Sequence, residues 1–323
     1  MPARDCILVT GGAGFVGSHF ARAAVESGSR VVVLDDLSGG PMPALAGIDF
    51  VRGDIADRAM VRATLATHRV TAVAHFAGKI QVAESVTQPA LYFEHNVVRT
   101  LALLDVVREH VGTFLFSSSA AVYGVPHQMP IAETAPLAPI NPYGASKLAI
   151  EHALEAYGIA YGLHWAALRY FNAAGAHPDG TLHEAHDPET HLIPLVIDAA
   201  LRRRPPLTVH GNDYSTPDGT CIRDYVHVCD LARAHLAALD ALDAGTAVAA
   251  TNLASGRGFS VFEGIAEAER VLGKPVPVTI GARRVGDPDR LLATGERAAE
   301  VLGWRPEYSD LTTLIEDAAR ARK

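Results

Sequence analysis

The sequence predicts an α/β fold in which helices cover both faces of a doubly wound parallel sheet. Two observations predict it: short apolar runs alternate with longer helix-like stretches through the first half of the chain, and a glycine-rich turn follows the first apolar run. In chain order, strands are predicted at residues 6–10, 30–34, 50–52, 72–76, 114–117 and 163–169. Helices are predicted between them, at residues 15–25, 91–109 and 143–157 among others.

The first predicted strand leads through the turn Thr10-Gly-Gly-Ala-Gly-Phe-Val-Gly17 into a helix. Gly11 permits the tight turn, Gly14 lets the backbone approach a pyrophosphate, and Gly17 lets the helix pack close to the strand. The free N–H groups of the helix N-terminus can then bind the anion. Because a glycine triplet alone is a weak signal, its context decides what it means.

That context is typical of a dinucleotide site. The second predicted strand is followed by Asp35, at roughly the spacing expected of the acid that binds an adenosine ribose hydroxyl. A carboxylate at this point favours NAD over NADP, because it would repel a 2′-phosphate. Ligands of such sheets bind beyond the carboxyl ends of the strands, where residues 53–55, 75–78 and 117–119 are predicted to lie.

Composition narrows the function classes. Hydrophobic residues make up 49% of the 323 residues and charged residues 20%, which is typical of a soluble globular enzyme. The formal net charge of −8 argues against a nucleic-acid binder, which needs a basic surface. The three cysteines, Cys6, Cys221 and Cys229, form no C-x-x-C pair, so a reduced cytoplasmic setting is expected. No segment approaches the length of a membrane span.

The pattern of the chain loosens in its second half. Prolines recur through residues 125–142, which are therefore predicted to be a loop. We predict a dinucleotide-binding domain at residues 1–171 and a smaller α/β substrate domain at residues 172–323. A helical stretch within residues 226–250 is expected to pack back on the first domain.

Tyr143 and Lys147 stand four residues apart on a predicted helix and therefore share one face. A nearby ammonium favours phenolate, so Lys147 is expected to lower the pKa of Tyr143 toward working pH. Such a tyrosine can take a proton from a hydroxyl while hydride leaves the same carbon, and Ser119 can hydrogen-bond that oxygen. The alternative is a surface tyrosine and lysine that match by chance. The glycine turn, Asp35 and Ser119, in the right order, argue against it.

Together these residues resemble the extended short-chain dehydrogenase/reductase family, which has the Rossmann fold, and within it the UDP-glucose 4-epimerase branch. The resemblance covers essentially the whole chain. The motifs that carry it are Val9–His19, His75-Phe-Ala-Gly78, Phe116–Gly124, Pro142–Lys147, Leu168-Arg-Tyr-Phe-Asn172, Gly211-Asn-Asp-Tyr214 and Asp218–His227.

The resemblance implies a role for each matching position. Catalytic roles fall to Ser119, Tyr143 and Lys147. The positions implied to line the NAD site are Gly11, Gly14, Phe15, Val16, Gly17, Asp35, Asp36, Asp54, Ile55, Phe76, Ala77, Gly78, Asn96, Ser117, Tyr143, Lys147 and Tyr170. Those implied to contact the UDP-sugar are Ser119, Tyr143, Asn172, His191, Leu192, His210, Arg223, Tyr225, Arg284, Asp287 and Leu291. Arg223 and Arg284 are suited to neutralise a diphosphate.

The chain departs from the family pattern in three places. A lysine usually found at the position of Ile80 is displaced to Lys79, an asparagine is replaced by His191, and an aromatic residue near the uracil by His210. The spacing of His183-Glu-Ala-His186 does not place both rings on one helix face, so no metal is expected and the loop histidines are expected near an anionic substrate.

The resemblance implies a redox-neutral NAD-dependent epimerase that interconverts UDP-glucose and UDP-galactose through a 4-keto sugar, with NAD staying bound. A 4-epimerase of UDP-N-acetylglucosamine or a UDP-pentose remains an alternative. A nucleotide-sugar dehydratase or decarboxylase needs an acid just after the serine, where Ala120 and Ala121 stand. A cofactor-sensing binding protein need not keep Ser119, Tyr143 and Lys147 together.

Substrate breadth and assembly are also expectations from the resemblance. Leu291 falls where a sugar-pocket gatekeeper stands, and a residue smaller than tyrosine there is associated with admitting N-acetyl sugars. UDP-galactose is therefore expected as the main substrate, with some activity on UDP-N-acetylgalactosamine. The alternative is that Leu291 only packs in the second domain. The helices at residues 91–109 and 143–157 are expected to form a homodimer interface.

Overall fold

The computed structural model describes residues 6–40, 43, 46–126, 128–284 and 287–322. Residues 1–5 of the predicted first domain, residue 127 of the predicted proline-rich loop and residue 323 of the predicted second domain lie outside this described part. The strands of the main sheet are β1 (Ile7–Thr10), β2 (Val31–Asp35), β3 (Ile48–Arg52), β4 (Ala72–His75), β5 (Thr113–Ser117), β6 (His164–Arg169) and β10 (Ala249–Asn252).

These seven strands form one parallel sheet in the order β3-β2-β1-β4-β5-β6-β10. The predicted fold class is confirmed, and each of the six predicted strands is present with ends shifted by no more than two residues. The seventh strand, β10, comes from the second half of the chain and pairs with β6. Its sequence, Ala-Ala-Thr-Asn, lacks the run of β-branched apolar residues that marked the other strands, so the pattern did not predict it.

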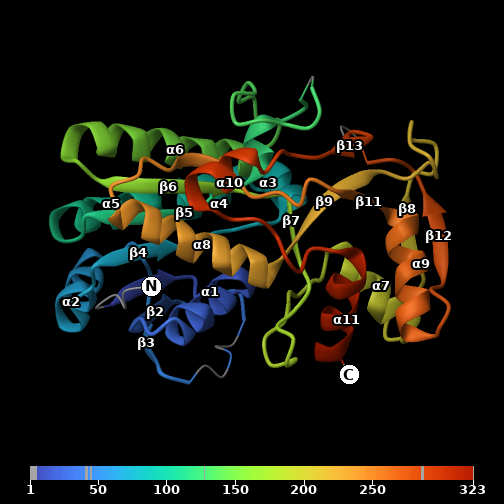
Figure 1. Ribbon diagram of the computed structural model, residues 1–323, viewed down its shortest axis with the longest axis horizontal. Coiled ribbons are helices and arrows are strands. Elements are labelled where there is room, and N and C mark those ends of the chain that lie inside the picture. Colours follow the sequence, from blue (N-terminus) through green and yellow to red (C-terminus); the bar gives the residue numbers. More distant parts are fainter. Residues whose placement is uncertain (1–5, 41–42, 44–45, 127, 285–286, 323) are drawn as a thin grey trace.

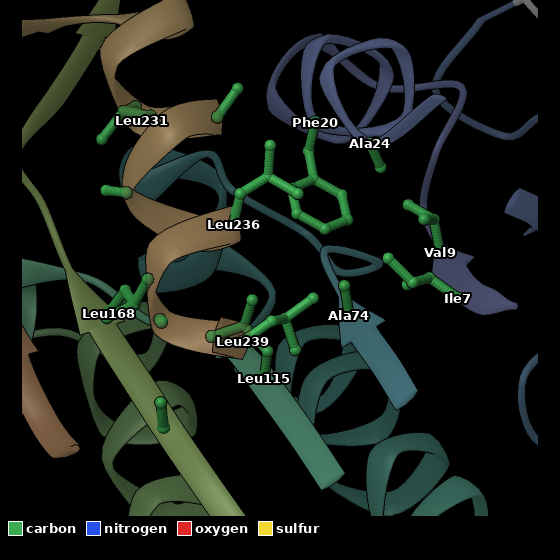
Figure 2. Close-up of a cluster of buried hydrophobic side chains, with 14 of the residues drawn as sticks. Ile7, Val9, Phe20, Ala24, Ala74, Leu115, Leu168, Leu231, Leu236 and Leu239 are labelled. Atoms are coloured by element: carbon green, nitrogen blue, oxygen red, sulfur yellow. The ribbon is translucent and has the colours of Figure 1, made fainter. Parts of the chain in front are cut away.

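Side chains alternate across the sheet and build a core on each face. In β1, Ile7 and Val9 face helices α1 (Phe15–Glu26) and α8 (Val228–Asp243), whereas Leu8 faces the side covered by α2 (Arg58–His68), α5 (Arg99–His110) and α6 (Pro142–Tyr161). Figure 2 shows side chains of α1 and α8 meeting over the strands. The labelled residues are Ile7, Val9, Phe20, Ala24, Ala74, Leu115, Leu168, Leu231, Leu236 and Leu239.

The helix predicted at residues 91–109 is interrupted. A short helix α3 (Val82–Thr87) precedes α4 (Pro89–Phe93), and a π-helical turn, η1 (Glu94–Val98), separates α4 from α5. A π-turn leaves no mark in hydrophobic periodicity, and such turns are frequent at functional sites. By contrast, α6 has clear ends, because the Asn141 side chain caps its N-terminus and Gly162 adopts φ +70° at its C-terminus.

A second group of elements lies at the opposite end of the molecule from the large sheet (Figure 1). Strands β7 (Asn172–Ala174), β9 (Ile222–His227), β11 (Gly258–Ser260) and β13 (Arg290–Leu291) form a four-stranded sheet, and β8 (Leu207–His210) pairs with β12 (Val278–Gly281). Helices α7 (Leu192–Ala200), α9 (Val261–Leu272) and α11 (Leu311–Ala321) share a separate apolar core, and α10 (Glu296–Leu302) contacts α8.

The chain crosses between these two groups more than once. Helix α8 follows β9 of the small sheet but packs on α1, and β10 completes the large sheet. The two-domain division at residue 172 remains a prediction, and α8 and β10 are the segments that return to the first part. Within the described residues, every helix is too short or too polar to cross a bilayer.

Three histidines are buried in this core without charge. Burial lowers the pKa of His75 to about 3, and Lys147 nearby acts in the same direction. Burial also lowers the pKa values of His19 and His235 to about 4. Because the unfolded chain binds protons at these imidazoles below about pH 6.5 and the folded chain does not, the stability that they contribute is lost as the pH falls from about 6.5 toward 4.

We predict that His235→Gln makes the free energy of unfolding less dependent on pH under acidic conditions. Between about pH 4 and 6.5, the slope of the unfolding free energy against pH should fall by about 1.4 kcal/mol per pH unit, the value for one proton. Urea unfolding followed by circular dichroism measures it. His152→Gln, on an exposed part of α6, is the matched control and should leave the slope unchanged. Equal slopes for the wild type and His235→Gln would contradict the account.

Candidate active site

Close backbone contacts account for two glycines of the turn, one at the end of β4 and one within the turn itself. Gly11 adopts φ +70°, and a Cβ built on it would lie 2.4 Å from the backbone nitrogen of Ala77. A Cβ on Gly17 would lie 2.3 Å from the carbonyl oxygen of Gly11. A side chain at Gly11 would therefore push the turn away from the end of β4, and a side chain at Gly17 would distort the turn itself.

The N-terminus of α1 is open to an anion. Its N-cap, Gly14, provides no side-chain hydrogen bond, and the first turn has no acidic residue. The dipole and N–H groups of this end therefore favour a negatively charged group. The half-buried carboxylate of Asp35 stabilises the glycine turn, because it accepts a hydrogen bond from the N–H of Ala13 at 3.0 Å. It also accepts a hydrogen bond from the N–H of Leu37 at 2.8 Å.

A polar rim continues along the carboxyl ends of β2 and β3. Asp54 pairs with Arg99 of α5 at 2.6 Å, and the neighbouring Ile55 is buried. Partial burial opposes the ionisation of Asp36, but hydrogen bonds from Ser38 and the charge of Arg99 hold the pKa of this carboxyl below its usual value. These are positions at which the resemblance places the NAD site.

The loop after β4 is fixed by Asn96, which lies in the π-turn η1. The Asn96 side chain accepts from the N–H of Lys79 at 2.7 Å and donates to the carbonyl oxygen of Lys79 and to the Ser146 hydroxyl, both at 3.0 Å. A Cβ on Gly78 would lie 2.9 Å from the Asn96 amide oxygen. The π-turn thus joins the end of β4 to α6, and it fixes the backbone of the displaced lysine, Lys79.

The three predicted catalytic residues converge at the carboxyl end of β5. Ser119 caps the short 3₁₀ helix η2 (Ala120–Tyr123) by accepting from the N–H of Ala121 at 3.1 Å. Lys147 is buried, and its ammonium donates to the carbonyl oxygen of Ser117 at 2.9 Å. The same ammonium lies 5.9 Å from the ring centre of Tyr143.

The protonation of this group differs from the prediction. Burial raises the pKa of Tyr143 above its usual value, although a hydrogen bond with Ser119 acts against the rise. Burial also lowers the pKa of Lys147 to about 8, opposed by Glu151. The expectation that the pKa of Tyr143 is lowered is therefore wrong for the protein's own groups. The physical reason is that desolvation of the phenol outweighs the hydrogen bond with Ser119, while the Lys147 ammonium donates to a carbonyl oxygen.

A buried polar network behind α6 was not predicted. Glu151 and Arg169 are each 4% exposed and form an ion pair. Glu151 also accepts from Ser118, and Arg169 donates to the hydroxyl of Tyr123 at 2.8 Å. One signal could have indicated it: Glu151 follows Lys147 by four residues, as Lys147 follows Tyr143, so all three lie on one helix face.

Four of the side chains expected to contact a UDP-sugar lie on the small sheet. Register places Asn172 of β7 opposite Tyr225 of β9, and Leu291 of β13 opposite Arg223 of β9. The Asn172 amide donates to the carbonyl oxygen of Asp224 at 2.8 Å. These four expected residues therefore stand on three adjacent strands.

The predicted charged contacts are partly engaged within the protein. Arg223 forms an ion pair with Asp287 and donates to the carbonyl oxygen of Pro288 at 2.9 Å. The Tyr214 hydroxyl donates to Asp287 at 3.3 Å. Arg284 is exposed on the segment that leads to Asp287. Because Arg223 has a carboxylate partner, only its remaining N–H groups are free for an anionic ligand.

The remaining expected contacts lie in separate places. Leu291 packs on the apolar cluster that includes Ala120, so it lies close to the segment that begins at Ser119. His210 ends β8 beside Gly281 of β12. His191 is the N-cap of α7, which begins at Leu192, and its ring contacts the carboxylate of Glu184.

Comparisons with known proteins agree with this geometry. A family model described as the NAD dependent epimerase/dehydratase family matches residues 7–254. A UDP-glucose 4-epimerase of Halalkalibacterium halodurans is 48% identical over 313 residues, covering 97% of this chain and 94% of the relative. A UDP-glucose 4-epimerase of Azospirillum brasilense is 48% identical over 314 residues, covering 97% of this chain and 90% of the relative.

Solved structures agree over nearly the whole chain. A UDP-glucose 4-epimerase from Brucella ovis, in complex with NAD, has a TM-score of 0.95 at 50% identity, and the match covers 97% of each chain. A UDP-glucose 4-epimerase from Bifidobacterium longum, in complex with NAD+ and UDP, has a TM-score of 0.93 at 37% identity, covering 98% of each chain. A UDP-Glc/GlcNAc 4-epimerase from Campylobacter jejuni has a TM-score of 0.85 at 39% identity, covering 97% of this chain and 98% of that one.

We predict that Glu151→Gln lowers the free energy of unfolding by about 3–5 kcal/mol, because it leaves the Arg169 charge buried without its partner. Urea denaturation measures the loss. Glu26→Gln makes the same chemical change in an exposed ion pair with Arg22 and should cost less than about 1 kcal/mol. Similar losses for the two variants would show that the buried ion pair contributes no more to stability than the exposed one.

Proposed function

The chain belongs to the NAD dependent epimerase/dehydratase family, and we propose that it interconverts UDP-glucose and UDP-galactose through a 4-keto sugar. The observation that carries the proposal is the convergence of Ser119, Tyr143 and Lys147 beside the open glycine turn. Relatives of this activity share almost half of the sequence over nearly the full length. The protein is an enzyme that uses NAD.

The residues present fit this cofactor. The glycine turn lies against β4 with no room for a Cβ at Gly11, and the uncapped N-terminus of α1 suits a pyrophosphate. Asp35 stands at the end of β2, where its carboxylate can accept hydrogen bonds from ribose hydroxyls. When bound, NAD accepts the C4 hydride of the sugar and returns it, and its positive ring favours the Tyr143 phenolate.

The protein's own side chains accept and return the proton of the sugar O4. Tyr143 takes the proton from the sugar O4 while the C4–H bond breaks, and it returns that proton when the bond forms on the opposite face. Ser119 hydrogen-bonds the same oxygen and lowers the pKa of Tyr143. Lys147, held by the Ser117 carbonyl, keeps a positive charge below the phenol ring. The 4-keto sugar must rotate in the site between the two steps, so that its opposite face meets the cofactor. The protein therefore binds the UDP group tightly and the sugar loosely.

The second half of the chain supplies the UDP contacts in this proposal. Asp287 orients the Arg223 guanidinium, whose remaining donors face the diphosphate, and Arg284 adds a second charge. The other contacts proposed for the UDP-sugar are Asn172, His191, Leu192, His210, Tyr225 and Leu291. A dehydratase is disfavoured, because the positions after Ser119 are Ala120 and Ala121, which can supply no acid.

We further propose that the protein is a cytoplasmic homodimer. Its three cysteines are free, as expected in a reducing compartment. Large apolar side chains are exposed along the helices expected at the interface, among them Phe93 of α4, Val98 of η1 and Ile159 of α6. Burying such residues against a second copy would remove apolar area from water. A monomer in analytical ultracentrifugation would contradict the dimer.

The proposed function is tested by incubating the purified protein with UDP-galactose and no added cofactor. The wild type should form UDP-glucose, because bound NAD is regenerated in each turnover. Tyr143→Phe removes the proton acceptor but keeps the ring, so turnover should fall by about 10²–10⁴-fold while NAD stays bound. Resolving the two UDP-sugars by chromatography measures both variants.

The matched control is Tyr157→Phe, the same change fourteen residues farther along α6, where the hydroxyl donates to Asp105 instead. It should keep near-normal turnover. A wild type that retains NAD but converts no UDP-sugar would favour the cofactor-binding alternative. Normal turnover in Tyr143→Phe would show that another residue acts as the base.

We predict that Leu291→Tyr narrows the substrate range. The phenol ring would fill space beside the Ser119 segment, so turnover of UDP-N-acetylgalactosamine should fall at least about 10-fold more than turnover of UDP-galactose. Leu291→Met keeps the volume without the ring and should preserve the ratio. The measurement is kcat/KM for both sugars, and an equal loss on both would mean that Leu291 only packs the core.

A further inference from the structure

Four side chains that could bind a metal ion meet in the segment between β7 and α7. They are Glu184, His186, Glu189 and His191, and one ligand atom from each lies within 4.8 Å of the other three. None of these atoms belongs to the group around Tyr143. The segment between β7 and α7 contains no helix or strand of its own.

The closest three atoms contact one another as ion pairs whose geometry is poor for hydrogen bonds. Glu184 is 3% exposed, and the Nδ1 atoms of His186 and His191 both approach its Oε1, the first at 2.8 Å. Yet neither this oxygen nor Nδ1 of His191 has a hydrogen-bond partner of acceptable geometry among the described residues. A buried carboxylate oxygen without such a partner is costly. All four ligand atoms lie close enough together to surround one ion.

We propose that Glu184, His186, Glu189 and His191 bind one divalent transition-metal ion, with zinc as the best match. Two imidazole nitrogens and two carboxylate oxygens are a donor set that zinc accepts in four-coordinate sites. The two carboxylates balance the charge of the ion. The small movement needed to close a tetrahedron is available to a loop.

Neighbouring groups hold the four side chains in place through hydrogen bonds and ion pairs, as is usual around metal ligands. Oε1 of Glu189 accepts from the N–H of His191 at 2.9 Å, and its Oε2 accepts from Arg322 at 3.1 Å. Arg322 also pairs with Asp198 of α7 at 2.7 Å. Such outer contacts orient the ligands of metal sites. The cluster opens on a surface hollow also lined by His183, Ala185 and Arg203, which gives an ion access.

The site would act on the structure and not on the proton chemistry. His191 is the N-cap of α7, and the next residue, Leu192, begins the helix. An ion that ties His191 to Glu184 and His186 fixes the start of α7 relative to the preceding loop. If no ion binds, the same contacts are a charged pair. Burial then lowers the pKa of His191, but Glu184 raises it by more, so the pKa of this imidazole lies above its usual value.

The test uses the full-length protein without a polyhistidine tag, stripped with a chelator and desalted. Titration with zinc chloride by calorimetry should show about one equivalent bound per chain, and zinc should raise the midpoint of thermal unfolding. The double variant His186→Ala/His191→Ala should lose both effects. His183→Ala, an exposed histidine of the same loop, is the matched control and should keep them.

Zinc binding that is unchanged in the double variant, or absent from the wild type, would overturn the proposal. If the double variant does not fold, cobalt(II) added to the stripped wild type decides instead. Intense visible absorption of a four-coordinate site supports the proposal, and the weak spectrum of six-coordinate aqueous cobalt overturns it. Because none of these readouts uses a UDP-sugar, the result does not depend on the proposed epimerase activity.

Discussion

The position of α6, the helix that carries the proposed catalytic residues Tyr143 and Lys147, depends on one buried ion pair between Glu151 of α6 and Arg169 of β6. Charges removed from water are tolerated only when their hydrogen bonds are complete, and here Ser118 and Tyr123 provide the additional bonds. The pair thereby joins α6 to the ends of β5 and β6 through polar contacts that tolerate little displacement. Lys147 and Tyr143 lie one and two turns before Glu151, so their distance from the carboxyl end of β5 follows from the same anchor.

Most of the fold could be predicted because its signals are local. A strand such as Val31–Asp35 is marked by its own β-branched residues, and the turn at Gly11 needs a left-handed backbone that glycine favours. Strand β10 has no such mark, since it is defined only by pairing with β6. The π-turn that carries Asn96 also escaped prediction, because its extra residue alters hydrogen bonding and not the apolar pattern.

The candidate site was predictable in its residue types but not in its electrostatics. The spacing of Tyr143 and Lys147 places them on one helix face, yet the direction of a pKa shift depends on burial and on partners distant in sequence. The Lys147 ammonium bonds to Ser117, thirty residues earlier in the chain, and desolvation controls the phenol. Likewise, Arg223 binds Asp287, sixty-four residues later, so its free donors could not be counted from sequence.

The central claim is that one bound NAD molecule takes the hydride from the sugar C4 and returns the same hydride to it. Tyr143 accepts the proton of the sugar O4 and later gives it back. The most direct measurement uses UDP-galactose that carries deuterium at C4, incubated with the purified protein in ordinary water without added cofactor. Mass spectrometry and NMR of the UDP-glucose formed then locate the label. The account predicts that the deuterium is retained at C4. Its replacement by hydrogen from the solvent would contradict the account.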